Sequence, residues 1–247
     1  MKNCLCTLCA VIALLVSGTA IAGDPIGRFD TARQTWMVDT GTIQCEFFEG
    51  CMFPTGFRKD SSLYPNFSLL DQLTFGKEKF YLKDERWAEV TVRVNTPEMF
   101  RIECRGHFGR NGSPRFALCE NAEAVYTYVF RRGSGKVEMQ SEVAVRKGTP
   151  VKYSLFLAGW LGLEFRTLRL SGRSVRPVLG KRFTAADGGS LECPMGTVIL
   201  PAGSVIAARY MRYDKQGRIY QSAFLESNAG ELKAPGKITA AMTLEFR

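Results

Sequence analysis

The sequence predicts an all-β protein folded as an antiparallel sandwich or barrel, with at most one short helix. Apolar residues recur at every second position through most of the chain beyond Ala88, which is the period of half-buried strands. Turn signals rich in Gly, Pro, Asn and Asp separate these short segments at the spacing typical of antiparallel β domains. No internal repeat and no low-complexity tract interrupts the pattern.

The N-terminal segment has the pattern of a secretory signal peptide. Lys2 supplies a positive charge, an apolar run extends from Leu8 to Val16, and Ala20-Ile21-Ala22 matches an A-x-A cleavage signal. The apolar run is too short to span about 30 Å of hydrocarbon comfortably as a membrane anchor. We therefore expect residues 1–22 to be removed and residues 23–247 to form the mature β-sandwich domain.

The first part of the mature chain mixes several signals. A polar lead-in over Gly23–Thr42 precedes a strand over Ile43–Phe47, and the segment Gly50–Pro65 has the Pro and Gly content of an irregular region. Asn66–Phe75 has the spacing of one short helix capped by Asn66. Two alternating strands then follow, Ala88–Val94 and Phe100–Cys104. They are joined by a turn over Asn95–Glu98, which predicts a hairpin.

The rest of the chain continues with strands and turns. Gly106–Pro114 reads as a glycine-rich loop, and Gly148–Pro150 is the clearest break, where a subdivision of the domain is conceivable. The other predicted strands are Tyr126–Phe130, Val137–Val145, Leu163–Leu170, Val198–Leu200, Ala207–Tyr213 and Arg218–Phe224. The turns between them are predicted at Gly133–Gly135, Pro201–Gly203 and Asp214–Gly217.

The chain ends on its clearest strand, which begins after Pro235 and Gly236. The apolar residues alternate over five steps without a breaker, and they are Ile238, Ala240, Met242, Leu244 and Phe246. A strand of this kind needs a partner strand, either inside the molecule or in another one.

Charge and cysteine content limit the function classes. The net charge of +9 permits attraction to anionic partners, although a soluble surface with a charge bias is the favoured explanation, and an exported protein seldom meets nucleic acid. Five cysteines remain after cleavage, and export favours disulfides. The short-range pairs are Cys45–Cys51 and Cys104–Cys119, and Cys193 is left over. With one histidine and no CxxC pair in the mature chain, we expect no metal and no cofactor.

No catalytic motif is visible. The single histidine, His107, lies in the glycine-rich segment beside Arg105 and Arg110. As a general base it would need an orienting carboxylate and a nucleophile, and no sequence motif supplies them. A pair of catalytic carboxylates cannot be seen in a sequence. We therefore predict a loop histidine and a protein that is not an enzyme.

The terminal strand resembles the C-terminus of chaperone–usher fimbrial subunits, with Gly236 upstream, alternating apolar residues and the aromatic Phe246 one residue before the end. The signal peptide and Cys45 in an early strand agree with this resemblance. It implies an immunoglobulin-like sandwich that lacks one strand and assembles by strand donation, with the residues of the terminal strand lining the groove. A periplasmic chaperone, an usher and neighbouring subunits are the implied partners, and transit through the periplasm to the cell surface is implied.

The sequence thus favours a non-enzymatic fimbrial or surface-assembly subunit, for which a host glycan or an anionic surface is a further partner. The alternative is an exported monomeric β-rich protein that binds a ligand or serves the cell envelope. An exported hydrolase is a third hypothesis, and it predicts a cleft with convergent carboxylates or a catalytic base near His107.

Overall fold

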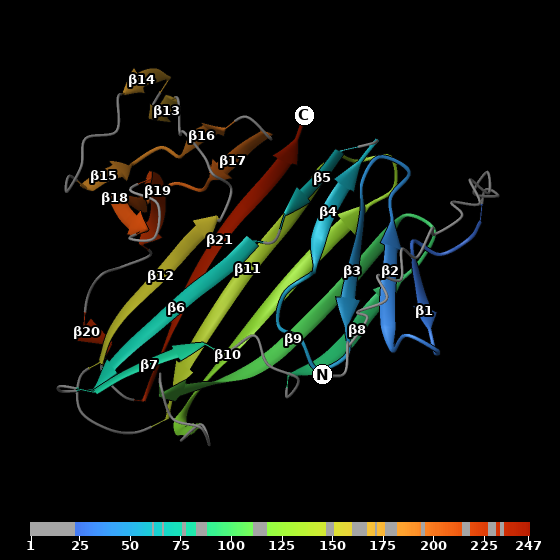
Figure 1. The fold of residues 1–247 in the computed structure, drawn as a ribbon, viewed down its shortest axis with the longest axis horizontal. Helices are drawn as coiled ribbons and strands as arrows, with labels where there is room; N and C mark the ends of the chain where they lie inside the picture. The colour runs from blue at the N-terminus through green and yellow to red at the C-terminus, as the bar shows by residue number, and fades with distance from the viewer. Residues whose placement is uncertain are drawn as a thin grey trace, which may run out of the picture.

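A computed structural model describes residues 23–60, 62–65, 67–75, 78–82, 88–110, 118–146, 151–159, 167–170, 172–175, 182–193, 196–213, 218–226, 231–232 and 235–247. Within these residues the regular secondary structure is entirely β-strand, and the strands form three antiparallel sheets (Figure 1). The predicted fold class, an all-β antiparallel sandwich, is confirmed.

The first sheet is a run of consecutive hairpins at the N-terminus. Its strands in order are β1 (Gly27–Asp30), β2 (Thr35–Asp39), β3 (Gln44–Phe48), β4 (Gly56–Lys59) and β5 (Ser62–Pro65). The segment predicted as a polar lead-in therefore supplies the hairpin β1–β2, and the segment predicted as irregular supplies β4 and β5.

The second sheet is much larger and combines segments from most of the chain. Its strands in spatial order are β14 (Arg173–Val175), β13 (Thr167–Leu170), β16 (Gly189–Cys193), β17 (Gly196–Leu200), β21 (Gly236–Phe246), β11 (Lys136–Val145), β10 (Leu118–Arg131), β9 (Met99–Arg110), β7 (Glu78–Leu82), β6 (Phe67–Phe75), β12 (Val151–Gly159) and β20 (Glu231–Leu232). The remaining strand, β8 (Glu89–Asn95), pairs with the first half of β9. Strands from both sides of Gly148–Pro150 thus belong to one sheet, while that break itself lies outside the described residues.

The third sheet is small. It consists of β15 (Arg182–Ala185), β18 (Ser204–Tyr213) and β19 (Arg218–Glu226). The pairing of β18 with β19 confirms the two predicted strands on either side of Asp214–Gly217, and that turn lies outside the described residues. Strand β19 lies beside β12 of the large sheet.

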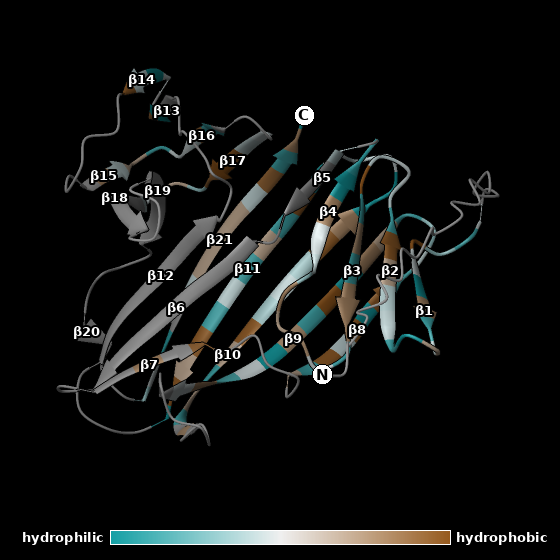
Figure 2. Cartoon of the chain, viewed as in Figure 1, coloured by the Kyte–Doolittle hydropathy of each residue, from teal (hydrophilic) through white to brown (hydrophobic). Residues whose placement is uncertain are grey.

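The five-stranded sheet covers part of one face of the large sheet, at β8, β9 and β10, and the main core lies between them (Figure 1). On β9 and β10 alternate side chains are fully buried, and Figure 2 shows the resulting bands of high and low hydropathy along β10 and β11. This alternation is what a strand needs when one face packs on a second layer and the other meets water. The buried residues of β9 and β10 are Phe100, Ile102, Cys104, Phe108, Cys119, Ala122, Ala124, Tyr126, Tyr128 and Phe130.

Aromatic rings join the two layers. The ring centroid of Phe47 on β3 lies 5.0 Å from that of Tyr128 and 6.0 Å from that of Phe130, both in edge-to-face contact. The ring centroid of Phe57 on β4 lies 4.8 Å from that of Phe246 at the end of β21. Such pairs stabilise a core by about 0.5–1.5 kcal/mol beyond the area that they bury.

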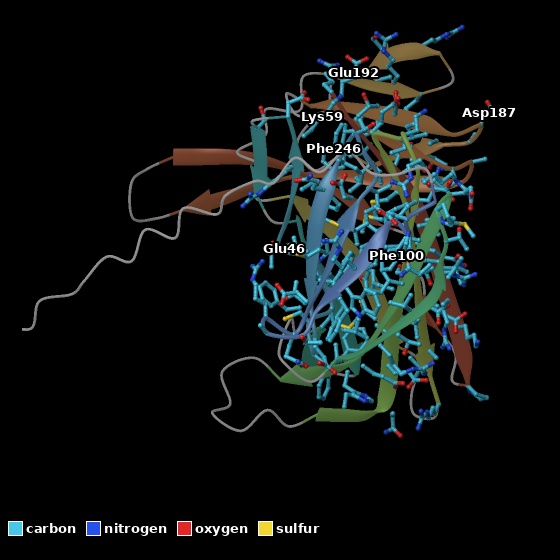
Figure 3. The ribbon with its side chains drawn as sticks, turned by 90° about the vertical axis from the view of Figure 1, so that its right-hand side faces the viewer. Glu46, Lys59, Phe100, Asp187, Glu192 and Phe246 are labelled. Atoms are coloured by element: carbon cyan, nitrogen blue, oxygen red, sulfur yellow. The ribbon has the colours of Figure 1, made fainter. Side chains whose placement is uncertain are left out.

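Polar contacts tie the edges of the two sheets together. The backbone N–H of Gly27 donates to the side-chain oxygen of Asn95 at 3.0 Å, and the Asn95 amide donates to the Gly27 carbonyl at 2.9 Å. The Lys59 ammonium on β4 donates to the carbonyl of Phe246 at the end of β21 at 3.0 Å, and Figure 3 shows these two residues beside each other. The contacts of Asn95 satisfy the backbone groups of Gly27 on the edge strand β1.

Two local predictions are wrong. The predicted helix over Asn66–Phe75 is the strand β6 over its described residues Phe67–Phe75, because pairing with β7 and β12 overrides the local helical spacing. The predicted loop over Gly106–Pro114 is strand from Gly106 to Arg110, and residues 111–117 lie outside the described part.

The terminal strand and several turns are confirmed. β21 spans Gly236–Phe246, as its alternation predicts, and the predicted hairpin across Asn95–Glu98 joins β8 to β9. The turns at Gly133–Gly135 and Pro201–Gly203 also lie where they are predicted, with positive φ at Gly133 and Gly203. Of the predicted strand Leu163–Leu170, the described residues Thr167–Leu170 form β13.

Candidate functional site

The single histidine lies on a strand of the large sheet, on the face directed away from the five-stranded sheet. Its neighbours Gly106 and Phe108 on β9 are buried, and His107 is exposed. Gly106 is required by packing, because a Cβ at this position would overlap with Sδ of Met52. The glycine that made this segment look like a loop therefore allows the second layer to approach the strand closely.

The register of β9 and β10 places Glu123 directly opposite His107. Directly opposite residues on antiparallel strands have Cβ atoms about 4.5–5.5 Å apart and project from the same face. The register between the two strands shifts from Leu118 to Glu123, so an irregularity ends immediately beside this pair. Such irregularities commonly direct side chains at functional sites.

Two arginines hold the Glu123 carboxylate. Arg105 Nη1 lies 3.2 Å from Glu123 Oε1, and Arg146 Nη2 lies 3.2 Å from Glu123 Oε2. Each carboxylate oxygen therefore has its own guanidinium partner. The Glu123 side chain is only 16% exposed, so this position is better shielded than a typical surface ion pair. We call His107, Glu123, Arg105 and Arg146 the Glu123 cluster.

Both arginines are themselves positioned by the fold. The backbone N–H of Arg146 donates to the Asn121 carbonyl at 2.8 Å, which fixes Arg146 just beyond the end of β11. Arg105 lies opposite Glu89 in the register of β8 and β9, and Glu89 Oε2 is 4.0 Å from Arg105 Nε. Glu89 is highly exposed and holds Arg105 only loosely.

A second charged group lies on the same face. Glu103, two residues before Arg105 on β9, has Oε2 at 2.7 Å from Arg93 Nε and Oε1 at 2.9 Å from Arg101 Nη2. Burial alone would raise the pKa of Glu103, but the hydrogen bonds and charges of Arg93 and Arg101 outweigh it and lower that pKa. We call Glu103, Arg93 and Arg101 the Glu103 cluster.

The Glu123 cluster has the groups that general acid–base catalysis requires. Imidazole is the side chain whose ordinary pKa allows it to give or take a proton near neutral pH. A carboxylate held across from it supplies a second group for proton transfer, and guanidinium groups bind oxygen ligands. Among the described residues, no group of three or more His, Cys, Asp and Glu side chains lies close enough together to hold a metal ion.

The residues predicted for a partner strand or groove lie in β21. Met242, Leu244 and Phe246 are buried and Ala240 is half-buried, all on the face that forms the core. The backbone of Ile238 pairs with that of Val143, and its side chain lies outside the described part. β21 pairs with β11 along Gly236–Glu245 and with β17 along Thr243–Phe246, so this strand has partner strands within its own molecule.

The four predicted disulfide cysteines lie in or beside the core. Cys45, Cys104 and Cys119 are buried, Cys51 is half-buried, and the structure forms no disulfide among these four residues. Burial raises the pKa of the Cys45 thiol well above its ordinary value, which keeps that thiol neutral. The pairs Cys45–Cys51 and Cys104–Cys119 stay predictions, and the side chain of Cys193 lies outside the described part.

The predicted signal peptide, residues 1–22, lies outside the described residues. In the part of the chain that is described, no helix has the length and apolar character needed to cross a membrane.

No family model and no curated protein sequence matches the chain. Its fold is similar to an α-mannosidase from Enterococcus faecalis V583, with a TM-score of 0.55 and 11% identity over 92% of this chain and 30% of that one. A glycosyl hydrolase family 38 protein from Enterococcus faecalis is similar with a TM-score of 0.53 and 10% identity, over 92% of this chain and 31% of that one. The chain thus spans about a third of the length of these proteins.

A galactose mutarotase related enzyme from Lactobacillus acidophilus aligns with a TM-score of 0.45 and 9% identity, over 86% of this chain and 97% of that one. At 10% and 11% identity, the similarities to the α-mannosidase and the glycosyl hydrolase family 38 protein show a shared fold. The prediction that this protein is not an enzyme is contradicted, because the two proteins of similar fold are an α-mannosidase and a glycosyl hydrolase family 38 protein.

Sequence reasoning found His107 but missed its carboxylate. Glu123 is 16 residues further along the chain, in a segment that resembles a solvated turn, and only the pairing of β9 with β10 brings it opposite His107. The one available signal was the alternation of β10 itself, which places Glu123 on the face opposite Ala122 and Ala124.

Proposed function

We propose that this protein is an exported carbohydrate-active enzyme that performs general acid–base chemistry on a sugar at the Glu123 cluster. The observation that carries the proposal is that His107 lies opposite Glu123 in the sheet. The Glu123 carboxylate forms ion pairs with Arg105 and Arg146. Export comes from the predicted signal peptide over residues 1–22.

The roles of the residues follow from their chemistry. His107 is exposed, so a bound sugar can reach its imidazole, and an imidazole within hydrogen-bond reach can act as a general acid or base. Glu123 is shielded, and each of its oxygens is held by a guanidinium group, so its carboxylate accepts hydrogen bonds at a defined position. The proton-transfer groups lie on the rigid central strands of the sheet, which favours precise geometry.

The fold supports a carbohydrate substrate. A region of similar fold forms part of the α-mannosidase from Enterococcus faecalis and of a glycosyl hydrolase family 38 protein. Function is decided by the site and not by the fold, so the proposal depends on the Glu123 cluster.

The test is an activity measurement on the full chain, expressed with residues 1–22 so that export takes place. The purified protein is assayed against a panel of nitrophenyl glycosides for bond cleavage and against free aldoses by polarimetry for anomer interconversion. We expect turnover of at least one sugar, and we expect His107→Gln and Glu123→Gln each to lower kcat by about 100-fold or more, which is typical of a lost acid or base.

The matched control is Glu138→Gln. Glu138 lies on the same face of the sheet in a one-to-one ion pair with Arg131 at 3.1 Å, and its register partner on β10 is Val129, six residues from Glu123. This variant should keep wild-type kcat and KM. Absence of turnover across the panel, or equal activity in all three variants, would falsify the proposal.

Assembly by strand donation, with a periplasmic chaperone and an usher as partners, stays a prediction that comes from the resemblance of the terminal strand. Its measurement is the mass of the exported protein in native mass spectrometry, with and without a co-expressed chaperone. A one-to-one complex supports strand donation, and a folded monomer that is stable alone contradicts it.

A further inference from the structure

We propose that the substrate of the Glu123 cluster is an anionic oligosaccharide, carrying carboxylate or sulfate groups, and that it extends along β9 onto the Glu103 cluster. The inference rests on the proposed function, because it names the class of substrate for the same site. The observation behind it is that each of the two clusters contains two arginines and one glutamate.

The Glu123 cluster holds two guanidinium groups and one shielded carboxylate, and Glu89, a highly exposed residue outside the cluster, also pairs with Arg105 at 4.0 Å. Arg146 is 65% exposed, so N–H groups that do not bind Glu123 are open to a ligand. Guanidinium groups recognise carboxylate and sulfate oxygens with two parallel hydrogen bonds, which a neutral hydroxyl does not match.

The Glu103 cluster repeats the same arrangement. Arg93 and Arg101 share Glu103 and are each about half exposed. The register of β8 against β9 shifts between Val92 and Val94, so Arg93 is the extra residue of a bulge. A bulge redirects a side chain at the cost of one unpaired backbone position, and here it brings a second guanidinium to the Glu103 carboxylate.

The two clusters lie in one line on the outer face. Arg101, Glu103, Arg105 and His107 alternate with the buried residues of β9 and so project from the same side. Arg101 and Arg105 are four residues apart, which corresponds to about 14 Å along a strand. That separation suits a ligand of several sugar units and exceeds what one monosaccharide covers.

The rest of this face is balanced. The other ion pairs described on it join one cation to one carboxylate, and they are Arg131–Glu138, Lys136–Glu245, Arg169–Glu192 and Lys237–Glu142. The positive excess therefore lies at the Glu103 cluster, next to the acid–base pair. A polyanionic sugar chain placed there has its charged groups on the arginines and one glycosidic unit beside His107.

The test is calorimetric binding of three oligosaccharides of equal length, one built from uronates, one sulfated and one neutral, to the full exported protein. We expect at least one anionic oligosaccharide to bind about tenfold or more tightly than the neutral one, and its affinity to fall as salt is raised. The uronate and sulfated ligands separate the two sources of negative charge.

Two variants locate the binding. Arg101→Gln should weaken the anionic ligand about tenfold, because one charge-assisted contact is lost. The matched control is Arg33→Gln, which removes the same charge from a pair with Glu46 on the five-stranded sheet and should leave the affinity unchanged. Thermal melting of both variants separates lost binding from lost folding, and the salt dependence of the wild-type protein is a second readout that needs no variant.

The outcomes distinguish this inference from the proposed function. Equal affinity for the neutral and anionic ligands, or equal weakening by Arg101→Gln and Arg33→Gln, overturns the inference even where a neutral sugar is turned over. Tight binding of the anionic oligosaccharide that depends on Arg101, without turnover of any sugar, supports the binding of an anionic ligand along β9. It overturns the proposed catalysis.

Discussion

The two faces of β9 and β10 have the same backbone and opposite chemistry. On the inner face, aromatic rings such as Tyr128 and Phe130 interlock with Phe47 of the five-stranded sheet. On the outer face, arginines and glutamates form ion pairs around His107. Since successive strand residues point to opposite sides, the residues of β9 alternate between the buried core and the charged outer face.

The contrast has an energetic meaning. Burial of large apolar side chains stabilises a fold by about 1.5–3 kcal/mol each, whereas exposed ion pairs contribute about 0–1 kcal/mol. The inner face therefore determines whether the protein folds. The outer face can carry charged groups whose contribution to stability is small.

The largest expected effect tests the inner face. Phe47→Ala removes a fully buried ring from between the layers and should lower the free energy of unfolding by about 3–5 kcal/mol. Phe48→Ala is the matched control, because Phe48 is the next residue of β3, is half-buried on the other side and has the Arg33 guanidinium 5.9 Å from its ring. We expect it to cost about 1 kcal/mol. Urea unfolding of both variants measures the difference, and equal losses would contradict the two-faced description.

A substitution of intermediate expected effect tests how closely the two layers pack. Gly27 lies on β1 against the buried ring of Phe100, and a Cβ at this position would overlap with the ring. Gly27→Ala should therefore lower the free energy of unfolding by about 1–3 kcal/mol, since a rigid ring has no room to move. At Gly135 a Cβ would meet Thr42 at an ordinary 3.4 Å, so Gly135→Ala serves as the control in thermal melting. A stable Gly27→Ala protein would mean that the layers pack less closely than described.

The smallest effect tests the outer face through pH. Because the folded pKa of Glu103 is lowered, its ion pairs stabilise the protein above the unfolded pKa of about 4.3, and this contribution is lost as pH falls through the folded pKa. Glu103→Gln should therefore cost up to about 1 kcal/mol at pH 7 and nothing at pH 2. Urea unfolding at the two pH values measures this cost. A cost that persists at pH 2 would show that Glu103 contributes through packing and not through charge.

Many strands could be predicted from the sequence because alternation is a local property. One buried face was predicted from the alternation of Tyr126, Tyr128 and Phe130. Another was predicted from Met242, Leu244 and Phe246 in the terminal strand, and all six residues are buried. The helix predicted over Asn66–Phe75 failed because its local spacing is overridden by pairing with β7 and β12.

The candidate site shows the limit of local reasoning most clearly. Sequence reasoning weighed His107 as a general base, found no motif to support that role and predicted a loop histidine, because Gly106 and Gly109 are common loop residues. In the structure Gly106 belongs to a strand and lies against Met52, which comes from the connection between β3 and β4. A contact between segments so far apart in the chain leaves no trace in a local pattern.

By itself the sequence determined the fold class, the inward and outward faces of many strands, and the alternation that puts charges on the outer face of β9. The register of the sheet was decided only in the tertiary structure, and with it the meeting of His107 with Glu123 and of Glu123 with Arg105 and Arg146. The physical reason is that side-chain direction depends on the residue itself and its neighbours. Cross-strand partners are set by how two hydrophobic layers fit together over the whole sheet.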